Sequence, residues 1–176
     1  QQVSSAASDV YKRQDNGYST FIAGKWHLSR GKSGSSPEEQ GFDQNYGGGD
    51  SGVPKSYFYP YNIQTRGRGN ENAPDITKLP EVEKGYHLTD QLTDLTLDWI
   101  DKNYVSKKSK KPFFIYLSHY EVHTPFEGKL DLEEKYKAKA ERLYEGKNLK
   151  NPFSFESTTG ETVSYTHLTL PTTPVV

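Results

Sequence analysis

A lysine and a histidine stand two residues apart at Lys25 and His27, directly after the apolar run 20–23. Side chains two apart on an extended segment point to the same side, so both could hold one oxyanion. The ammonium would act as a point charge, and the imidazole as a hydrogen-bond donor or acceptor. Taken alone, the pair is more simply a surface lysine beside a histidine that bonds to the backbone. The position of the pair after a strand-like run makes an anion-binding role more plausible than it would be for an isolated pair.

Two further histidines, His119 and His123, follow a second hydrophobic run at 112–117. Histidines four apart share one face of a helix, where they could bind zinc. Val122 and Pro125 argue against a helix there, the chain has no cysteine, and no third ligand is marked nearby. The zinc interpretation is therefore weak, although it stays open on residue types alone.

The elements that must position these side chains are predicted in the order strand, long loop, helix, strand, helix. Aromatic and β-branched enrichment predicts strands at 18–24 and 112–118. The segment 29–80 is rich in Gly, Pro, Ser and Asn, which indicates irregular connection with short strands at most. The order favours a parallel crossover between the two strands. The crossover would bring Lys25 and His27, after the first strand, and His119 and His123, after the second, to one edge of the sheet. The expected fold class is α/β.

A helix is expected from about residue 86 to residue 104, because four apolar residues share one face while four aspartates face elsewhere. The apolar residues are Leu88, Leu92, Leu95 and Trp99, and the aspartates are Asp90, Asp94, Asp98 and Asp101. A last helix is expected after the histidines, with Asp131 as its N-cap and Glu134 three residues later. Its apolar stripe would comprise Leu132, Tyr136, Ala140 and Leu143.

Composition excludes several classes of function. The formal net charge of −1 gives no basic field to attract nucleic acid. No apolar run approaches the roughly 18 to 20 residues that span a bilayer, so we expect no membrane segment. Without cysteine there is no disulfide, no zinc-thiolate site and no cysteine nucleophile. With 32% hydrophobic residues and a mean hydropathy of −0.90, the chain is expected to form part of a domain.

Five motifs occur in order along the chain: GYSTFIAGKWHL at 17–28, GFD at 41–43, YHLTDQLTD at 86–94, KPFFIYLS at 111–118 and VHTP at 122–125. In this order and spacing they resemble the type I sulfatases, the arylsulfatase family of the alkaline-phosphatase-like superfamily. The resemblance covers roughly residues 15 to 150. It implies a partial alkaline-phosphatase-like sheet with flanking helices, and a parent protein that is a sulfuric ester hydrolase.

The resemblance implies catalytic roles for Lys25, His27 and His123. Lys25 would bridge the nucleophile and a sulfate oxygen, His27 would position the hydroxyl of the nucleophile, and His123 would bind the sulfate and assist the leaving oxygen. His119 matches a position that often precedes the last histidine, and we expect it near the substrate. In this family the nucleophile is a formylglycine made from Cys/Ser-x-Pro-x-Arg, and a Ca²⁺ ion held by oxygen ligands offsets the charge.

The chain departs from the family pattern where the nucleophile and the metal belong. Nothing before Gly17 fits the formylglycine motif, and Ser35-Ser36-Pro37 offers Ser-x-Pro without the arginine. The calcium-binding aspartates and a second active-site lysine are also missing. We therefore expect an internal fragment that is inactive alone, with no metal ligand and no formylglycine of its own.

Both ends differ from the middle, since 1–14 and 163–176 show no sustained helical period and match none of the family motifs. We expect them to be non-native, adapter-derived sequence or disordered termini, which leaves 15–162 as a partial sulfatase catalytic domain. By resemblance, the substrate is a sulfated carbohydrate or an aryl sulfate and the location is periplasmic or secreted. The alternatives are a phosphoryl-transfer member of the superfamily and a non-catalytic carbohydrate-binding piece.

Two features could bear on the substrate. The aromatic run 57–61 could stack on sugar rings, but aromatic residues in a long loop more often pack the loop down. Arg66 and Arg68 could recognise a second anionic group, but a solvated arginine pair is the simpler interpretation. Neither feature identifies the substrate.

Overall fold

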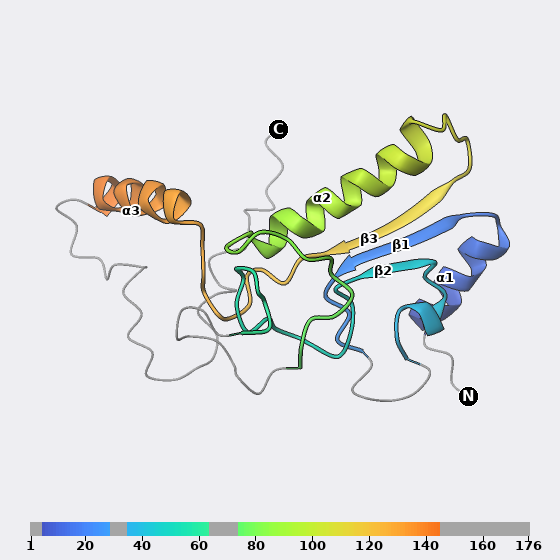
Figure 1. Ribbon diagram of the computed structural model, residues 1–176, viewed down its shortest axis with the longest axis horizontal. Coiled ribbons are helices and arrows are strands. Elements are labelled where there is room, and N and C mark those ends of the chain that lie inside the picture. The colour runs from blue at the N-terminus through green and yellow to red at the C-terminus, as the bar shows by residue number, and fades with distance from the viewer. Residues whose placement is uncertain (1–4, 29–34, 64–73, 145–176) are drawn as a thin grey trace, which may run out of the picture. The chain divides into compact units, whose positions relative to one another are not determined.

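The computed structural model describes residues 5–28, 35–63 and 74–144 of the chain. The chain divides into two compact units, 1–127 and 128–176. The elements of the first unit are α1 (Ser5–Asp15), β1 (Ser19–Gly24), η1 (Glu38–Gln40), β2 (Gln44–Tyr46), α2 (Leu88–Ile100), η2 (Asp101–Val105) and β3 (Phe113–Ser118). The second unit contains α3 (Leu130–Tyr144). Figure 1 shows these elements along the chain.

The strands form one parallel sheet with the order β2-β1-β3. β1 and β3 pair from Ser19 opposite Phe113 to Gly24 opposite Ser118. Because the pairing is parallel and in register, both strands end at the same edge of the sheet. The predicted α/β class and the predicted parallel crossover are confirmed.

Helices cover both faces of β1, which explains why this strand is almost wholly buried. Phe21 and Ala23 point to one face and pack with residues of α2. Ile22 points to the other face and packs with Val10 of α1 and with Phe42. Figure 1 shows α2 (green) and α1 (blue) on opposite sides of the sheet. A strand covered on both faces is expected to carry consecutive apolar residues, as β1 does at 21–23.

The long helix matches its prediction closely. It begins at Leu88, with His87 as an extended N-cap residue, and it ends at Ile100, where the π-helical turn η2 follows. Leu88, Leu92 and Trp99 are buried and Leu95 is partly buried, so the predicted apolar stripe does face the core. Within the described part of 29–80, η1 and β2 are the regular elements, as the composition predicted.

A helix occupies most of the predicted N-terminal end, 1–14, although the sequence shows no sustained helical period there. Residues 5–15 form α1, and its Val10 is buried beside Ile22 and Phe42. Arg13 also lies over the Phe114 ring, 4.4 Å from its centroid. A helix that buries a single large apolar residue shows no sequence period, which is why the pattern did not indicate it. The other predicted end, 163–176, lies outside the described residues.

The start of the last helix also differs from its prediction. α3 begins at Leu130, so Asp131 lies in its first turn and is not the N-cap. Glu133 instead reaches back, and its Oε1 accepts a hydrogen bond from the Gly128 N–H at 2.9 Å. Two residues of the predicted stripe are exposed, Leu132 at 42% and Tyr136 at 49%. Within the described ranges, no helix is both long and apolar enough to cross a bilayer.

Candidate functional site

The carboxyl ends of β1 and β3 are joined at Gly24. A Cβ atom on this residue would lie 1.9 Å from the Ser118 carbonyl oxygen, so no larger residue fits. Its φ of 101° is also one that favours glycine. The next residue, Lys25, donates its backbone N–H to the same Ser118 oxygen at 2.7 Å. The close approach at Gly24 therefore fixes where the Lys25 backbone leaves the sheet.

The side chain of Lys25 is partly buried. Burial holds the pKa of its ammonium below the ordinary value of 10.5, because leaving water disfavours the charged form. A cation with less water around it attracts an anion more strongly than one in bulk solvent. Lys25 is thus suited to hold an anion.

His27 is held by a glycine-rich segment, 47–52. Its N–H donates to the Gly49 carbonyl at 2.9 Å. Its imidazole lies directly over Gly52, where an added Cβ would be 2.4 Å from the ring Cε1 and 2.5 Å from Nδ1. The φ of His27 is 55°, a left-handed conformation that costs a residue with a side chain about 1 kcal/mol or more. The segment therefore determines both the backbone and the ring position of His27.

The same glycine-rich segment also contacts the end of β3. The hydroxyl of Tyr120, which is buried, donates to the Gly47 carbonyl at 2.8 Å. Because Gly49 receives the His27 N–H, this one segment bridges the residues that follow both strands. The residues that follow β1 and β3 therefore lie at one edge of the sheet, and the glycine-rich segment 47–52 contacts both.

Neither of the two predicted histidines after β3 lies on a helix, and His123 closes a turn. His119 directly follows Ser118, and its Nδ1 is buried without a hydrogen-bond partner among the described residues. The His123 N–H donates to the Tyr120 carbonyl at 3.0 Å, which closes the turn. The His123 Nδ1 lies 3.1 Å from Thr124 Oγ1. A turn of this kind keeps its first and last Cα atoms within about 7 Å, so His123 stays near the strand end.

Lys25, His27, His119 and His123 thus share one sheet edge through their backbones. Their roles on a bound group stay predictions. In the described part of the chain, no group of three or more His, Cys, Asp or Glu side chains is arranged to hold a metal ion. Lys25 and the three histidines offer nitrogen donors, whereas Ca²⁺ takes oxygen ligands, so these four residues do not fit the calcium site that the family resemblance implies.

A buried polar cluster beside this edge was missed by sequence reasoning. Glu127 is only 5% exposed, and its Oε2 accepts hydrogen bonds from Ser56 Oγ and the Tyr57 N–H, both at 2.8 Å. His87 lies beside it, with Nε2 3.3 Å from the Glu127 carbonyl oxygen. The partners are about 70 positions apart in sequence, so no local pattern could have paired them.

The two substrate features have different outcomes. The aromatic run 57–61 packs its loop against the core, since Tyr57 and Tyr61 are both buried in the main hydrophobic cluster. The simpler of the two predictions for this run is confirmed. Arg66 and Arg68 lie outside the described residues.

Comparison with known proteins agrees with the motifs. The family model described as Sulfatase matches residues 9–168. An uncharacterized sulfatase of Escherichia coli K12, YdeN, is 30% identical over 121 residues, which cover 64% of this chain and 21% of that protein. The chain therefore spans about a fifth of the length of this curated relative.

Proposed function

Because the chain belongs to the sulfatase family, we propose that it carries the sulfate-binding side chains of an enzyme that cleaves sulfate esters. The observation that supports this most is the hydrogen bond from the Lys25 N–H to the Ser118 oxygen at 2.7 Å. That bond ties the GKWH segment to the strand that leads into His119 and His123. A partly buried cation and three imidazoles at one sheet edge suit a small anion.

Each basic side chain has a part in the proposed reaction. Lys25 offsets the negative charge on the sulfate oxygens, which is worth most where water is excluded. His27, whose ring is fixed over Gly52, bonds to the hydroxyl of the nucleophile and orients it. His123 bonds to the sulfate group and gives a proton to the leaving oxygen, as a general acid does. His119 contacts the substrate beside Lys25.

The attacking group comes from outside this sequence. The chain has no cysteine, and its Ser-x-Pro at 35–37 lacks the arginine of the modification motif. We propose that a formylglycine, made from a Cys or Ser elsewhere in the whole enzyme, supplies the nucleophilic oxygen. Any Ca²⁺ ion is likewise held by residues outside this sequence. The proposed substrate is a sulfated carbohydrate or an aryl sulfate, and the proposed location is the periplasm or the outside of the cell.

The proposal is tested by Lys25→Ala in the whole enzyme that contains this chain, with an aryl sulfate as substrate. Removing a charge that stabilises the transition state is expected to lower kcat by about a hundred- to a thousandfold. Lys110→Ala is the matched control, since Lys110 is exposed and precedes the six-residue β3. The length of that strand, about 20 Å, separates it from the proposed site.

The outcomes separate the alternatives. Turnover of the Lys25→Ala variant equal to that of the Lys110→Ala variant would rule out the proposed role of Lys25. Cleavage of an aryl phosphate in preference to the aryl sulfate would identify a phosphoryl-transfer relative. If the whole protein cleaves neither ester but binds sulfated glycans, the carbohydrate-binding alternative is correct.

A further inference from the structure

We infer that Tyr57 and Glu127 form a positioning pair that determines where His123 lies. Glu127 fixes the backbone at Tyr57, and the hydroxyl of Tyr57 holds the main chain of His123. This inference rests on the proposed function, because it assumes that His123 acts on the sulfate ester. Neither Tyr57 nor Glu127 is proposed to touch the substrate.

The first part of the pair is the Glu127 carboxylate. It is buried, and its Oε2 accepts two hydrogen bonds of 2.8 Å, from Ser56 Oγ and from the Tyr57 N–H. The other oxygen, Oε1, is buried without a hydrogen-bond partner among the described residues. Burying a carboxylate is costly unless donors satisfy it, so the two bonds to Oε2 are favoured strongly. Hydrogen bonds to a charged acceptor are also stronger than neutral ones. The backbone at residues 56–57 is therefore fixed by an acidic residue that follows the His123 turn.

The second part is the ring of Tyr57, which acts as a rigid spacer. Its ring stacks on His87, with centroids 6.0 Å apart and planes 14° from parallel. Its carbonyl accepts the N–H of Leu88, the first residue of α2, at 2.8 Å. A ring held by the core at this point has one position for its hydroxyl. That hydroxyl donates to the His123 carbonyl at 3.0 Å.

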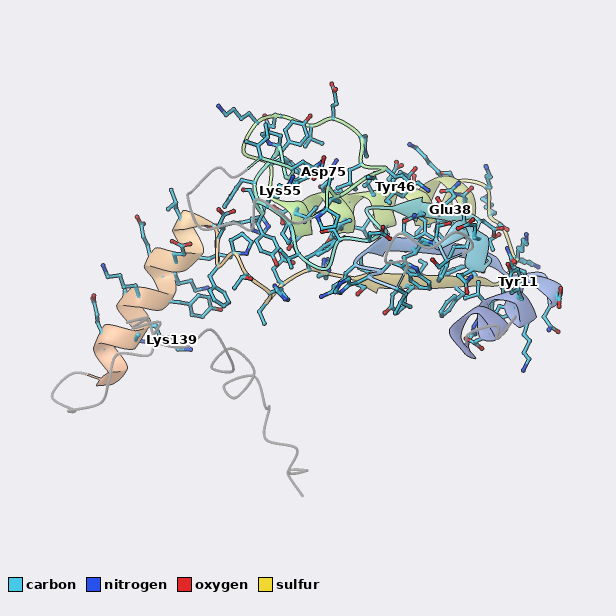
Figure 2. All side chains as sticks on the ribbon, turned by 90° about the horizontal axis from the view of Figure 1, so that it is seen from below. Tyr11, Glu38, Tyr46, Lys55, Asp75 and Lys139 are labelled. Atoms are coloured by element: carbon cyan, nitrogen blue, oxygen red, sulfur yellow. The ribbon has the colours of Figure 1, made fainter. Side chains whose placement is uncertain are left out.

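The segment before Tyr57 is braced from another direction. Lys55 forms an ion pair of 2.7 Å with Asp75, and Figure 2 shows the two residues side by side. The Lys55 side chain is largely covered, whereas Asp75 is more exposed. The backbone at Tyr57 is therefore held by the Lys55–Asp75 ion pair as well as by Glu127. The position of the Tyr57 hydroxyl is fixed as a result.

His123 depends on this fixed point because its own turn holds it only on one side. Its N–H bonds to the Tyr120 carbonyl inside the turn. Among the described residues, Tyr57 is the one outside this turn that bonds to the His123 main chain. Losing that bond frees the carbonyl and lets the turn shift. A shift of about 1 Å in a reacting group can lower a rate about a hundredfold.

The test is Tyr57→Phe in the whole enzyme, assayed with an aryl sulfate. This change removes only the hydroxyl that holds His123. We expect kcat to fall ten- to a hundredfold with KM nearly unchanged. Tyr61→Phe is the matched control, because Tyr61 is buried in the same cluster and its hydroxyl has no hydrogen-bond partner among the described residues. Equal kcat values for the two variants would overturn the inference.

A second comparison separates positioning from a general loss of stability. If Tyr57 acts through His123, Tyr57→Phe lowers kcat little further in a His123→Ala background, because the group it positions is gone. Independent, additive losses would overturn the inference. If His123→Ala alone keeps wild-type turnover, the proposed function of His123 fails instead, whatever Tyr57→Phe does.

The part of Glu127 is tested by two substitutions. Glu127→Gln keeps an oxygen that can accept the bonds from Ser56 and Tyr57, whereas Glu127→Leu removes both acceptors. We expect the Gln variant to keep most of the activity and the Leu variant to resemble Tyr57→Phe. A Leu variant with wild-type kcat would remove Glu127 from the pair. Tyr57→Phe retains the core packing, so the inference is testable even where Glu127→Leu unfolds.

Discussion

Two glycines determine where the proposed sulfate-binding side chains can lie. Gly24 lets the ends of β1 and β3 approach, since a Cβ there would meet the Ser118 oxygen at 1.9 Å. Gly52 leaves room for the imidazole of His27. The family resemblance predicted Lys25 and His27 as site residues, since their types and their place after a strand alone favoured a surface pair. The sequence could not predict the role of Gly52, because that contact depends on how the glycine-rich loop folds back.

Gly52→Ala is expected to displace the ring of His27. The new Cβ would lie 2.4 Å from the ring Cε1, a distance that the imidazole must relieve by moving. We expect kcat of the whole enzyme to fall at least about tenfold, since proton-handling groups contribute about a hundredfold or more.

Gly49→Ala is the comparison for this prediction. A Cβ there would meet nothing closer than Thr77 Oγ1 at 3.6 Å, and the carbonyl that receives the His27 N–H is retained. We expect a much smaller change in kcat than for Gly52→Ala. Similar losses in the two variants would show that the His27 ring does not depend on the space at Gly52.

We expect the reaction rate to fall at alkaline pH, because Lys25 loses its proton there. Burial holds its pKa below the ordinary 10.5, so its ammonium loses the proton at a lower pH than a solvated lysine does. The rate should fall as pH rises through that pKa. In Lys25→Arg the guanidinium stays protonated, so this alkaline limb should disappear. A pH–rate profile with the same alkaline limb in both proteins would contradict the assignment.

The same shift fixes the sign of the effect of Lys25 on stability. The unfolded chain keeps the higher pKa, so between the two pKa values the unfolded state binds more protons. The free energy of unfolding therefore rises with pH in that window. At neutral pH the buried ammonium costs stability, as expected of a group retained for binding.

At the scale of elements, the helix and strands that bury several apolar residues were predictable. The period of α2 is visible because Leu88, Leu92 and Trp99 share one face, and β1 contains the apolar run Phe21–Ala23. The three-residue strand β2 was not predictable, since Gln-Asn-Tyr has no strand pattern. It forms because it pairs with β1 and because Asn45 bonds to Gly48 through both its amide groups. Tertiary pairing decides such short elements.

Trp99→Ala is expected to loosen α2 from the sheet. Trp99 is 6% exposed, and its ring lies 4.9 Å from that of Phe21 on β1. Truncating a buried aromatic residue costs about 3 to 5 kcal/mol of unfolding free energy. Leu97→Ala is the control on the same helix, because Leu97 is 58% exposed. Its expected cost is within about 0.5 kcal/mol.

Urea denaturation of the whole protein, followed by circular dichroism, measures both costs. Equal costs for the Trp99 and Leu97 variants would show that α2 does not depend on this contact. Loosening α2 in the Trp99 variant would also disturb the proposed site, because Leu88 at the start of α2 donates its N–H to the Tyr57 carbonyl.

At the scale of the whole molecule, the chain spans about a fifth of the length of its curated relative, and its described residues form one three-stranded sheet. β3 is an edge strand in the described sheet, and its Phe113, Tyr116 and Leu117 are exposed. An edge strand leaves backbone N–H and C=O groups unpaired. The motifs allowed the family to be predicted. The shared sheet edge was also predictable, because parallel crossovers follow a general rule. The Tyr57–Glu127 pair could not be, because nothing local in the sequence joins residues so far apart.

The chain by itself is expected to be marginally folded and to release no sulfate. Its exposed apolar surface should bind a fluorescent hydrophobic dye, and its unpaired strand edge should promote association. The measurements are dye fluorescence and an aryl sulfate assay on the isolated chain. Release of sulfate by the isolated chain would contradict the proposal that the nucleophile lies elsewhere.

The most direct measurement is a crystal structure of the whole enzyme with its product, inorganic sulfate, bound. The proposed site predicts sulfate oxygens within about 3 Å of both Lys25 Nζ and a ring nitrogen of His123. It also predicts the imidazole of His27 over Gly52, facing the attacking group. A sulfate that touches neither Lys25 nor His123, with these side chains too far apart to share one anion, would contradict it.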